Sequence, residues 1–107
     1  MILFEDIKKL FSLQLKGNSC IEIEFLIEGS SKYDSCWMGK TPDKENAGDV
    51  YWYGLVSDGS EAYDYDNFRD LSAAPVFDGK SLEEIWEKVK VLSIDGCEPE
   101  SRIATYF

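Results

Sequence analysis

The sequence predicts an α+β domain: a largely antiparallel sheet of about four to five strands, with an N-terminal helix and one or two later helices packed on one face. Apolar residues recur at helical spacing near the start of the chain, and they alternate with polar residues in the next segment. The segments that join the expected strands up to residue 65 lack the helical pattern that a parallel sheet would need between strands. The 107 residues fit one acidic domain, 1–107, that is long enough to bury a core without disulfides or metal.

The first segment predicts an amphipathic helix that ends near Gly17 and Asn18. Side chains three and four residues apart form one mostly apolar stripe along such a helix, and charged side chains face water on the other side. The stripe consists of Leu3, Phe4, Ile7, Leu10, Phe11 and Gln14, and the solvent side of Glu5, Asp6, Lys8, Lys9 and Ser12.

Residues 20–28 form the clearest predicted strand, because apolar and acidic side chains alternate there with a period of two. One face of the strand is expected to enter the core, and the other is expected to carry three carboxylates. The inward residues are Ile21, Ile23, Phe25 and Ile27, and the outward ones Glu22, Glu24, Leu26 and Glu28.

Three further strands are predicted in the middle of the chain. A turn at 29–31 precedes a strand over 32–39, and the charged segment 40–49 is expected to be an exposed loop. Residues 50–56 are rich in side chains that suit a half-buried sheet surface. A turn over 57–60 then leads to a strand over 61–65, which is expected to complete a hairpin.

The last third of the chain predicts two short helices and a fifth strand. Residues 67–74 are expected to form a helix capped by Asp66 or Asn67 and stopped by Pro75. Ser81 and Glu84 match a capping box, which predicts a helix start there. Trp86 is expected to anchor this helix in the core, because it lies on the apolar stripe of Leu82, Ile85 and Val89. Residues 90–94 are expected to form the fifth strand, and the apolar tail 102–107 is expected to pack or pair.

Composition excludes several kinds of chemistry. The chain has 21 acidic and 11 basic residues, a formal net charge of -10 and no histidine, yet 44% of its residues are hydrophobic, so we expect it to fold. Without histidine it cannot form a Ser-His or Cys-His nucleophile pair. No glycine-rich phosphate-binding pattern is present, and nucleic acid is disfavoured as a partner by the negative charge. We therefore expect no enzymatic activity and no cofactor, and an enzyme with carboxylate or cysteine chemistry is the least favoured of the alternatives.

The sequence also indicates in which cellular compartment the protein is expected. Its first 15 residues do not combine a basic start with an unbroken apolar stretch, so we expect no secretory signal. No apolar run approaches the roughly 20 residues that a membrane span needs. Cys20, Cys36 and Cys97 are odd in number, widely spaced and form no Cys-x-x-Cys pair, which argues against a disulfide framework and a zinc site. Reduced thiols in the cytoplasm are the simplest interpretation.

The acidic and aromatic side chains of the central strands predict a surface that binds a basic protein. A negative field accelerates encounter with positive surfaces, and aromatic rings framed by acids are typical of interface hot spots. The alternative is that each ring belongs to the core or to an ordinary pair on the sheet. The candidate partner-binding residues are Glu22, Glu24, Tyr51, Tyr53, Asp58, Glu61, Asp64 and Asp66.

A second hypothesis assigns the acidic segment between Asp58 and Asp70 to a cation or small ligand, because calcium prefers oxygen ligands. Asp64 and Asp66 match the opening of a calcium loop. An EF-hand would then need a glycine and a glutamate at positions held by Arg69 and Pro75. A solvated strand edge or a helix cap is the favoured interpretation of these acids, and an accessory role for the whole chain remains open.

The stretch Val76-Phe77-Asp78-Gly79-Lys80-Ser81-Leu82-Glu83-Glu84-Ile85-Trp86 resembles a recurring segment of small uncharacterised bacterial proteins, which has no assigned activity. In overall character the chain resembles the immunity proteins of bacterial toxin systems, which are small, very acidic α+β proteins without catalytic residues. These neutralise a cognate toxin by covering it, often when the toxin is a basic nuclease. The resemblance implies an inhibitor of a basic toxin and transfers no functional residue.

Overall fold

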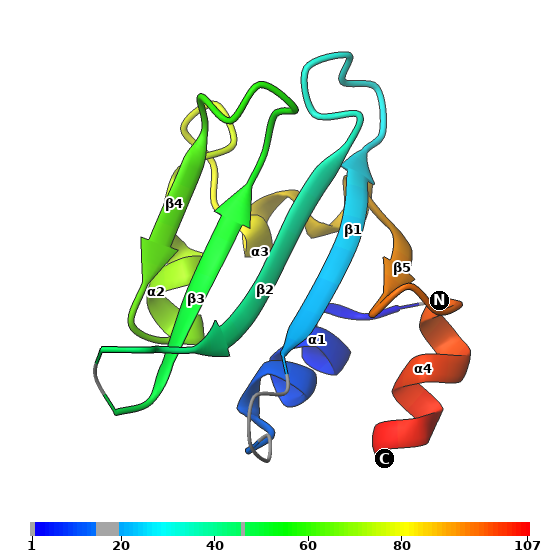
Figure 1. Cartoon of the computed structure of the whole chain (residues 1–107). Helices are drawn as coiled ribbons and strands as arrows, with labels where there is room; N and C mark the ends of the chain where they lie inside the picture. Colours follow the sequence, from blue (N-terminus) through cyan, green and yellow to red (C-terminus); the bar gives the residue numbers. More distant parts are fainter. Residues whose placement is uncertain (1, 15–19, 46) are drawn as a thin grey trace.

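The computed structural model describes residues 2–14, 20–45 and 47–107, and it has an N-terminal helix, a five-stranded antiparallel sheet and later helices (Figure 1). The predicted α+β class is therefore confirmed. Within the described ranges, no helix is long and apolar enough to cross a membrane. In chain order the elements are α1 (Phe4–Ser12), β1 (Ile21–Ile27), β2 (Cys36–Pro42), β3 (Asp49–Gly54), β4 (Ala62–Tyr65), α2 (Phe68–Ala73), α3 (Leu82–Ile85), the 3-10 helix η1 (Trp86–Lys88), β5 (Val89–Ile94) and α4 (Pro99–Tyr106).

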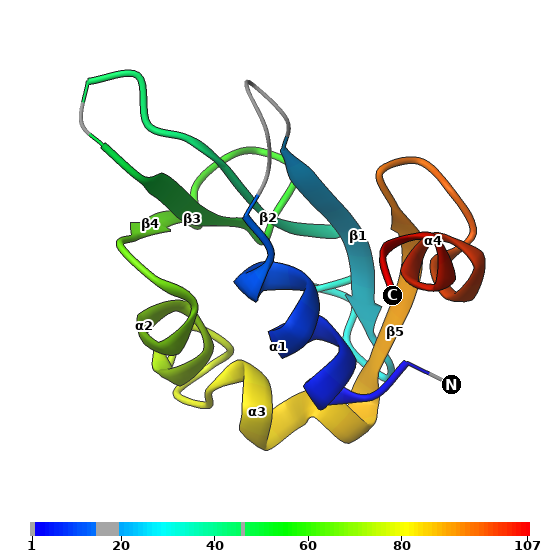
Figure 2. The same ribbon diagram turned by 90° about the horizontal axis from the view of Figure 1, so that it is seen from below.

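The strands lie in the order β4-β3-β2-β1-β5, and every neighbouring pair is antiparallel. The first four strands therefore form a meander, and β5 returns to pair with β1 at the other edge. Helices α1, α2 and α3 cover one side of the sheet, which we call the inner face, and α4 lies beside β5 (Figure 2). No helix stands in front of the opposite side in Figure 1, and we call this side the outer face.

The core lies between the inner face and the three helices. Cross-strand pairing places Ile23 opposite Met38 and Met38 opposite Tyr53, so these side chains form one row on the inner face. Both faces of β1 follow the predicted alternation, because every second residue is buried from Ile21 onward. The buried hydrophobic residues are Ile7, Leu10, Phe11, Ile21, Ile23, Phe25, Ile27, Tyr33, Cys36, Met38, Tyr53, Leu55, Leu71, Phe77, Leu82, Ile85 and Ile94.

The second strand differs from its prediction. It begins at Cys36 and continues to Pro42, whereas the sequence predicted a strand over 32–39 followed by a loop from residue 40. Residues 32–35 turn instead, because the amide of Tyr33 donates to the Ser30 hydroxyl at 3.1 Å and the carbonyl of Tyr33 accepts from the amide of Ile27 at 2.8 Å. The connection between β2 and β3 therefore starts only at Asp43.

Lys40 was expected in an exposed loop, but its side chain is buried and only 2% exposed. Its ammonium donates to the carbonyl of Phe11 at 2.8 Å and to the carbonyl of Leu13, both at the C-terminal end of α1. The same Nζ lies 3.7 Å from the carboxylate of Asp49 and 5.6 Å from the centroid of the Tyr51 ring. A cation bound to the last carbonyls of a helix satisfies groups that lack partners within the helix. The hydrogen bonds of Lys40 thus connect the end of α1 to β2 of the sheet.

The predicted helix starts are confirmed. Asn67 caps α2 by accepting the amide of Asp70 at 2.8 Å, and the helix ends before Pro75. The capping box of α3 is complete, since the Ser81 amide donates to Glu84 at 3.0 Å and the Glu84 amide donates to Ser81 at 3.3 Å. The end expected for the N-terminal helix, Gly17-Asn18, lies outside the described residues, but α1 already ends at Ser12.

Asp95 joins the C-terminal helix to the sheet. One carboxylate oxygen accepts the amide of Glu22 at 2.9 Å, and the other accepts from Arg102 Nε at 3.1 Å and from the Tyr106 hydroxyl at 2.9 Å. The apolar tail thus packs as a helix, with Ile103 and Tyr106 against the core. One carboxylate therefore connects β1, the end of β5 and α4.

Candidate functional site

The outer face combines aromatic rings with carboxylates. In one row Glu24 lies opposite Trp37, and Trp37 lies opposite Gly54. In the next row Glu22 lies opposite Gly39, Gly39 opposite Trp52, and Trp52 opposite Asp64. Since directly opposed residues of antiparallel strands project to the same side, these seven positions share the outer face. Two tryptophans therefore lie near the centre of a sheet surface that none of the described helices covers.

Two glycines of the outer face shape the surroundings of the tryptophans. The Trp52 ring lies across Gly39, because a Cβ built on Gly39 would be only 2.7 Å from a carbon of that ring. Trp52 is half-buried as a result, while Trp37 is 38% exposed. Gly54, opposite Trp37, leaves open space, since a Cβ there would meet no atom within 4 Å. One side of the Trp37 indole is thus accessible from solvent.

Among the described residues, the carboxylates of the outer face have no cationic partner, and that of Glu22 accepts a hydrogen bond from the Cys20 thiol at 4.0 Å. Within the described part of the chain, Glu22, Glu24 and Asp64 form no ion pair. Of the residues in the five strands only Lys40 and Lys90 are basic, and Lys40 is buried on the inner face. The face therefore presents negative charge beside two indoles and has little positive charge of its own.

The other acidic residues that were predicted to bind a partner do not lie on the outer face together. Asp58 is exposed in the β3–β4 turn, where it accepts the amide of Ser60 at 2.9 Å; hydrogen bonds with Ser60 lower the pKa of the Asp58 carboxyl. Asp66 is exposed between β4 and α2. The structure brings Glu22, Glu24 and Asp64 onto one face, and places Asp58 and Asp66 at opposite ends of β4.

Glu61 is engaged within the protein. Its carboxylate lies 2.9 Å from Lys32 Nζ and accepts the Tyr33 hydroxyl at 3.1 Å. The hydrogen bond to Glu61 is the main reason why the pKa of Lys32 is raised, and Asp78 adds to it from 3.3 Å. This cluster joins the β1–β2 turn to the start of β4, so Glu61 has less capacity to bind a partner than its sequence position suggested.

The expectation that Tyr51 and Tyr53 belong to the exposed surface is wrong. Both lie on the inner face, where Tyr53 is 1% exposed and its hydroxyl donates to the carbonyl of Leu71 at 3.1 Å. Tyr51 is half-buried and packs against Phe11, with 6.1 Å between the ring centroids. Trp52, which lies between them in the strand, is the residue that projects outward.

The buried phenols predict a loss of stability at high pH. Burial raises the pKa of five tyrosines, and it raises that of the Cys36 thiol to about 12. Above the ordinary pKa of about 10, the unfolded chain loses phenolic protons that the folded chain keeps, so the free energy of unfolding falls as the pH rises. The pKa of Lys40 is lowered by burial and acts in the opposite direction, but for one group only. The tyrosines are Tyr33, Tyr51, Tyr53, Tyr65 and Tyr106.

Urea unfolding between pH 8 and pH 11.5 measures this effect. We expect stability to decline slightly from about pH 9, where the Cys36 thiol of the unfolded chain ionises, and more steeply from about pH 10, by about 1.4 kcal/mol per pH unit for each proton by which the two states differ. Tyr53→Phe removes one such proton, so its slope above pH 10 should be shallower by about that amount even if the variant is less stable at neutral pH. A flat profile up to pH 11.5 would contradict the burial of these phenols.

The acids between residues 58 and 70 do not converge on a cation site. Asp58 lies in a turn, Asp64 on the outer face and Asp70 in the first turn of α2 next to its cap. Among the residues that the structure describes, no three acidic or cysteine side chains are grouped so that they could hold a metal ion. The three cysteines are free thiols, and Cys36 donates to the carbonyl of Leu55 at 3.3 Å.

The outer face has the chemistry of a binding surface. Carboxylates without a partner can accept charge-assisted hydrogen bonds from Arg or Lys, and an indole can take a cation on its ring face. The only signal for this surface in the sequence is the alternation of acidic and aromatic residues along the strands. No protein-family model, no curated protein and no solved structure matches this chain.

Proposed function

We propose that this chain is a non-enzymatic protein-binding module, of the immunity or inhibitor kind, whose outer face covers a basic surface of its partner. One observation carries the proposal: Trp37 and Trp52 lie on a sheet face that no helix of the described residues covers, framed by the carboxylates of Glu22, Glu24 and Asp64, which form no ion pair in the described part of the chain. Hot spots of protein interfaces are enriched in tryptophan and cluster near the centre of the contact.

The negative charge of the outer face and of the whole chain indicates a partner with a basic surface. An Arg side chain could stack on the exposed side of Trp37 and reach Glu24, the residue opposite Trp37 on β1. The net charge of -10 would steer a basic protein toward the module, and the same charge would repel a nucleic acid. The association rate should therefore fall as the salt concentration rises.

The inhibitor role rests on the overall resemblance to immunity proteins. Such a protein acts by occupying the working surface of its toxin, which needs complementary charge and area but no reactive group. A basic nuclease offers a positive substrate-binding surface of this kind. Free thiols at Cys20, Cys36 and Cys97 suit the reducing conditions of the cytoplasm, which is the compartment we propose.

The test is retention of a stoichiometric basic protein from lysate of the source cell by the immobilised chain, followed by measurement of affinity with the purified partner. Glu22→Gln/Glu24→Gln/Asp64→Asn should weaken binding at least tenfold, mainly through the association rate. Trp37→Ala should weaken it by a similar factor, mainly through faster dissociation.

The matched control removes the same number of negative charges elsewhere. Glu5, Glu45 and Glu87 are exposed on α1, on the β2–β3 connection and on η1. Glu5→Gln/Glu45→Gln/Glu87→Gln should bind almost as tightly as the original chain. If both triple variants weaken binding equally, net charge and not the outer face determines the contact. Full binding by the Trp37 and the outer-face variants would exclude this face as the interface.

A further inference from the structure

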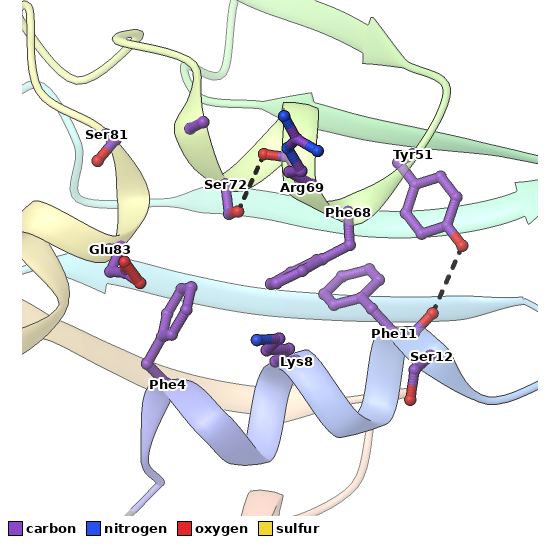
Figure 3. A pocket seen from close by; sticks show the side chains of 11 residues that line it. Phe4, Lys8, Phe11, Ser12, Tyr51, Phe68, Arg69, Ser72, Ser81 and Glu83 are labelled. Atoms are coloured by element: carbon purple, nitrogen blue, oxygen red, sulfur yellow. Dashed lines mark hydrogen bonds between the residues drawn. The ribbon is translucent and has the colours of Figure 1, made fainter.

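The helical side of the protein contains a cavity of about 590 Å³ between α1, α2 and the start of α3 (Figure 3). This volume lies within the range of small-molecule sites. The cavity is on the opposite side of the sheet from Trp37 and Trp52, so it is independent of the proposed partner surface. Its lining comes from Phe4, Lys8, Phe11, Ser12, Tyr51, Phe68, Arg69, Ser72, Ala73, Ser81 and Glu83.

Aromatic rings form the wall of the cavity. Phe68 stacks on Phe11, with 5.0 Å between the ring centroids and 24° between the planes, and its centroid lies 5.9 Å from that of Phe4. Tyr51 extends the wall from β3. The two phenylalanines of α1 are seven residues apart, so they lie on one side of the helix. A flat apolar group could pack against this wall.

Two cations without partners line the same cavity. Lys8 lies between Phe4 and Phe11 on α1, and Arg69 follows Phe68 on α2 (Figure 3). Within the described ranges neither side chain forms an ion pair, although the chain as a whole has 21 acidic residues. Their donors therefore remain available to a ligand.

The remaining polar groups of the lining are engaged locally or carry the opposite charge. The hydroxyls of Ser12 and Ser72 donate to carbonyls of their own helices, at 2.6 Å and 3.2 Å. Ser81 belongs to the cap of α3. Glu83 lies beside Phe4 and would repel a second negative group at that end (Figure 3).

We propose that this cavity binds a small aromatic monocarboxylate. The aromatic body of the ligand packs against Phe4 and Phe68, while the buried Phe11 ring supports Phe68 from the core side. The carboxylate of the ligand accepts hydrogen bonds from Lys8 and Arg69. Charge-assisted hydrogen bonds of this kind are stronger than neutral ones, and Arg can bind a carboxylate with two parallel donors. A cationic ligand is disfavoured by the same two residues.

The probe for this site is 1-naphthylacetate, and its neutral amide, 1-naphthylacetamide, is the matched ligand. Titration of the isotope-labelled chain is followed by amide NMR shifts at 150 mM salt, which screens the negative charge of the protein. We expect saturable shifts at Ser12, Ser72 and Ala73, with a Kd on the order of 0.1 to 1 mM for a ligand of this size. The amide should bind at least fivefold more weakly than the acid.

Lys8→Gln/Arg69→Gln should reduce the affinity for the acid to that for the amide and leave the affinity for the amide unchanged. The control, Lys44→Gln/Lys80→Gln, removes two exposed lysines that do not line the cavity and should bind both ligands as before. The proposal is overturned if no saturable shifts appear, if they map away from the cavity, or if acid and amide bind equally. None of these outcomes bears on the partner surface, whose variants leave the cavity lining unchanged.

Discussion

Replacing Lys40 with methionine is expected to lower the free energy of unfolding by about 3 kcal/mol, because it leaves buried groups without their cation. Methionine fills a similar volume but donates no hydrogen bond. The carbonyls of Phe11 and Leu13 would then lose the ammonium donor that they share, and Asp49 would lose the charge that lies 3.7 Å away. In a domain of this size such a change corresponds to a fall in Tm of about 10 to 20 °C.

Urea or thermal unfolding of Lys40→Met beside Lys44→Met measures this effect. Lys44 is exposed in the connection that follows β2, so its replacement should change stability by less than about 0.5 kcal/mol. Equal stabilities for the two variants would mean that Lys40 does not hold the end of α1. The loss should be accompanied by faster hydrogen exchange in α1, because the last turn of that helix depends on this side chain.

Gly39→Ala is expected to cost about 3 kcal/mol or more, although it adds a single methyl group. A Cβ at this position would lie 2.1 Å from the backbone oxygen of Ile21 and 2.7 Å from the Trp52 ring. Real atoms do not approach so closely, so β1 must move away from β2 and Trp52 must leave its position. The variant should therefore also bind the basic partner more weakly, since Trp52 belongs to the proposed surface.

Gly54→Ala is the matched control for this prediction, because Gly54 lies on the same face and has nothing within 4 Å of its hypothetical Cβ. It should be neutral or slightly more stable, since alanine loses less backbone entropy than glycine on folding. Chemical denaturation of the two variants compares them directly. If Gly39→Ala is as stable as Gly54→Ala, the close approach of Trp52 to Gly39 is not a constraint of the fold.

The parts of the fold that the sequence predicted are those determined by local signals. The alternation over 20–28 gave β1 and its two faces, because a single strand with one buried side needs only its own periodicity. The caps at Asn67 and Ser81 depend on side chains that bond to nearby amides, so they too could be predicted. The antiparallel order of the first four strands followed from the short connections between them.

Lys40 and the start of β2 could not be predicted, because both depend on contacts between distant segments. A lysine in a charged stretch indicates a loop, and only the arrival of the end of α1 and of Asp49 makes its burial favourable. The alternation around Tyr33 predicts a strand, but its hydroxyl lies 3.1 Å from the Glu61 carboxylate and 3.3 Å from the carbonyl oxygen of Val76. These partners lie 28 and 43 residues further along the chain.

The candidate surface was predicted in part. The carboxylates of Glu22, Glu24 and Asp64 lie where strand alternation put them. The strand over 50–56 consists almost entirely of aromatic and aliphatic residues, so its sequence does not show which side is buried, and Tyr51 and Tyr53 were chosen in place of Trp52. Lys8 is exposed, as its place on the solvent side of the helix predicted, but it is also four residues from Phe4 and three from Phe11 and lines the cavity with them.

Because β5 pairs with β1 and not with β4, the sheet can be completed only after the last strand of the chain has been synthesised. The strands from β1 to β4 pair with neighbours that follow them directly, so their contacts close short loops, which form fast. The pairing of Ile27 with Val89 closes a loop that contains β2, β3, β4, α2, α3 and η1. During synthesis, β1, whose inner side is apolar, therefore keeps one unpaired edge until residue 94 has left the ribosome, and a nascent chain is exposed to wrong pairing at this edge.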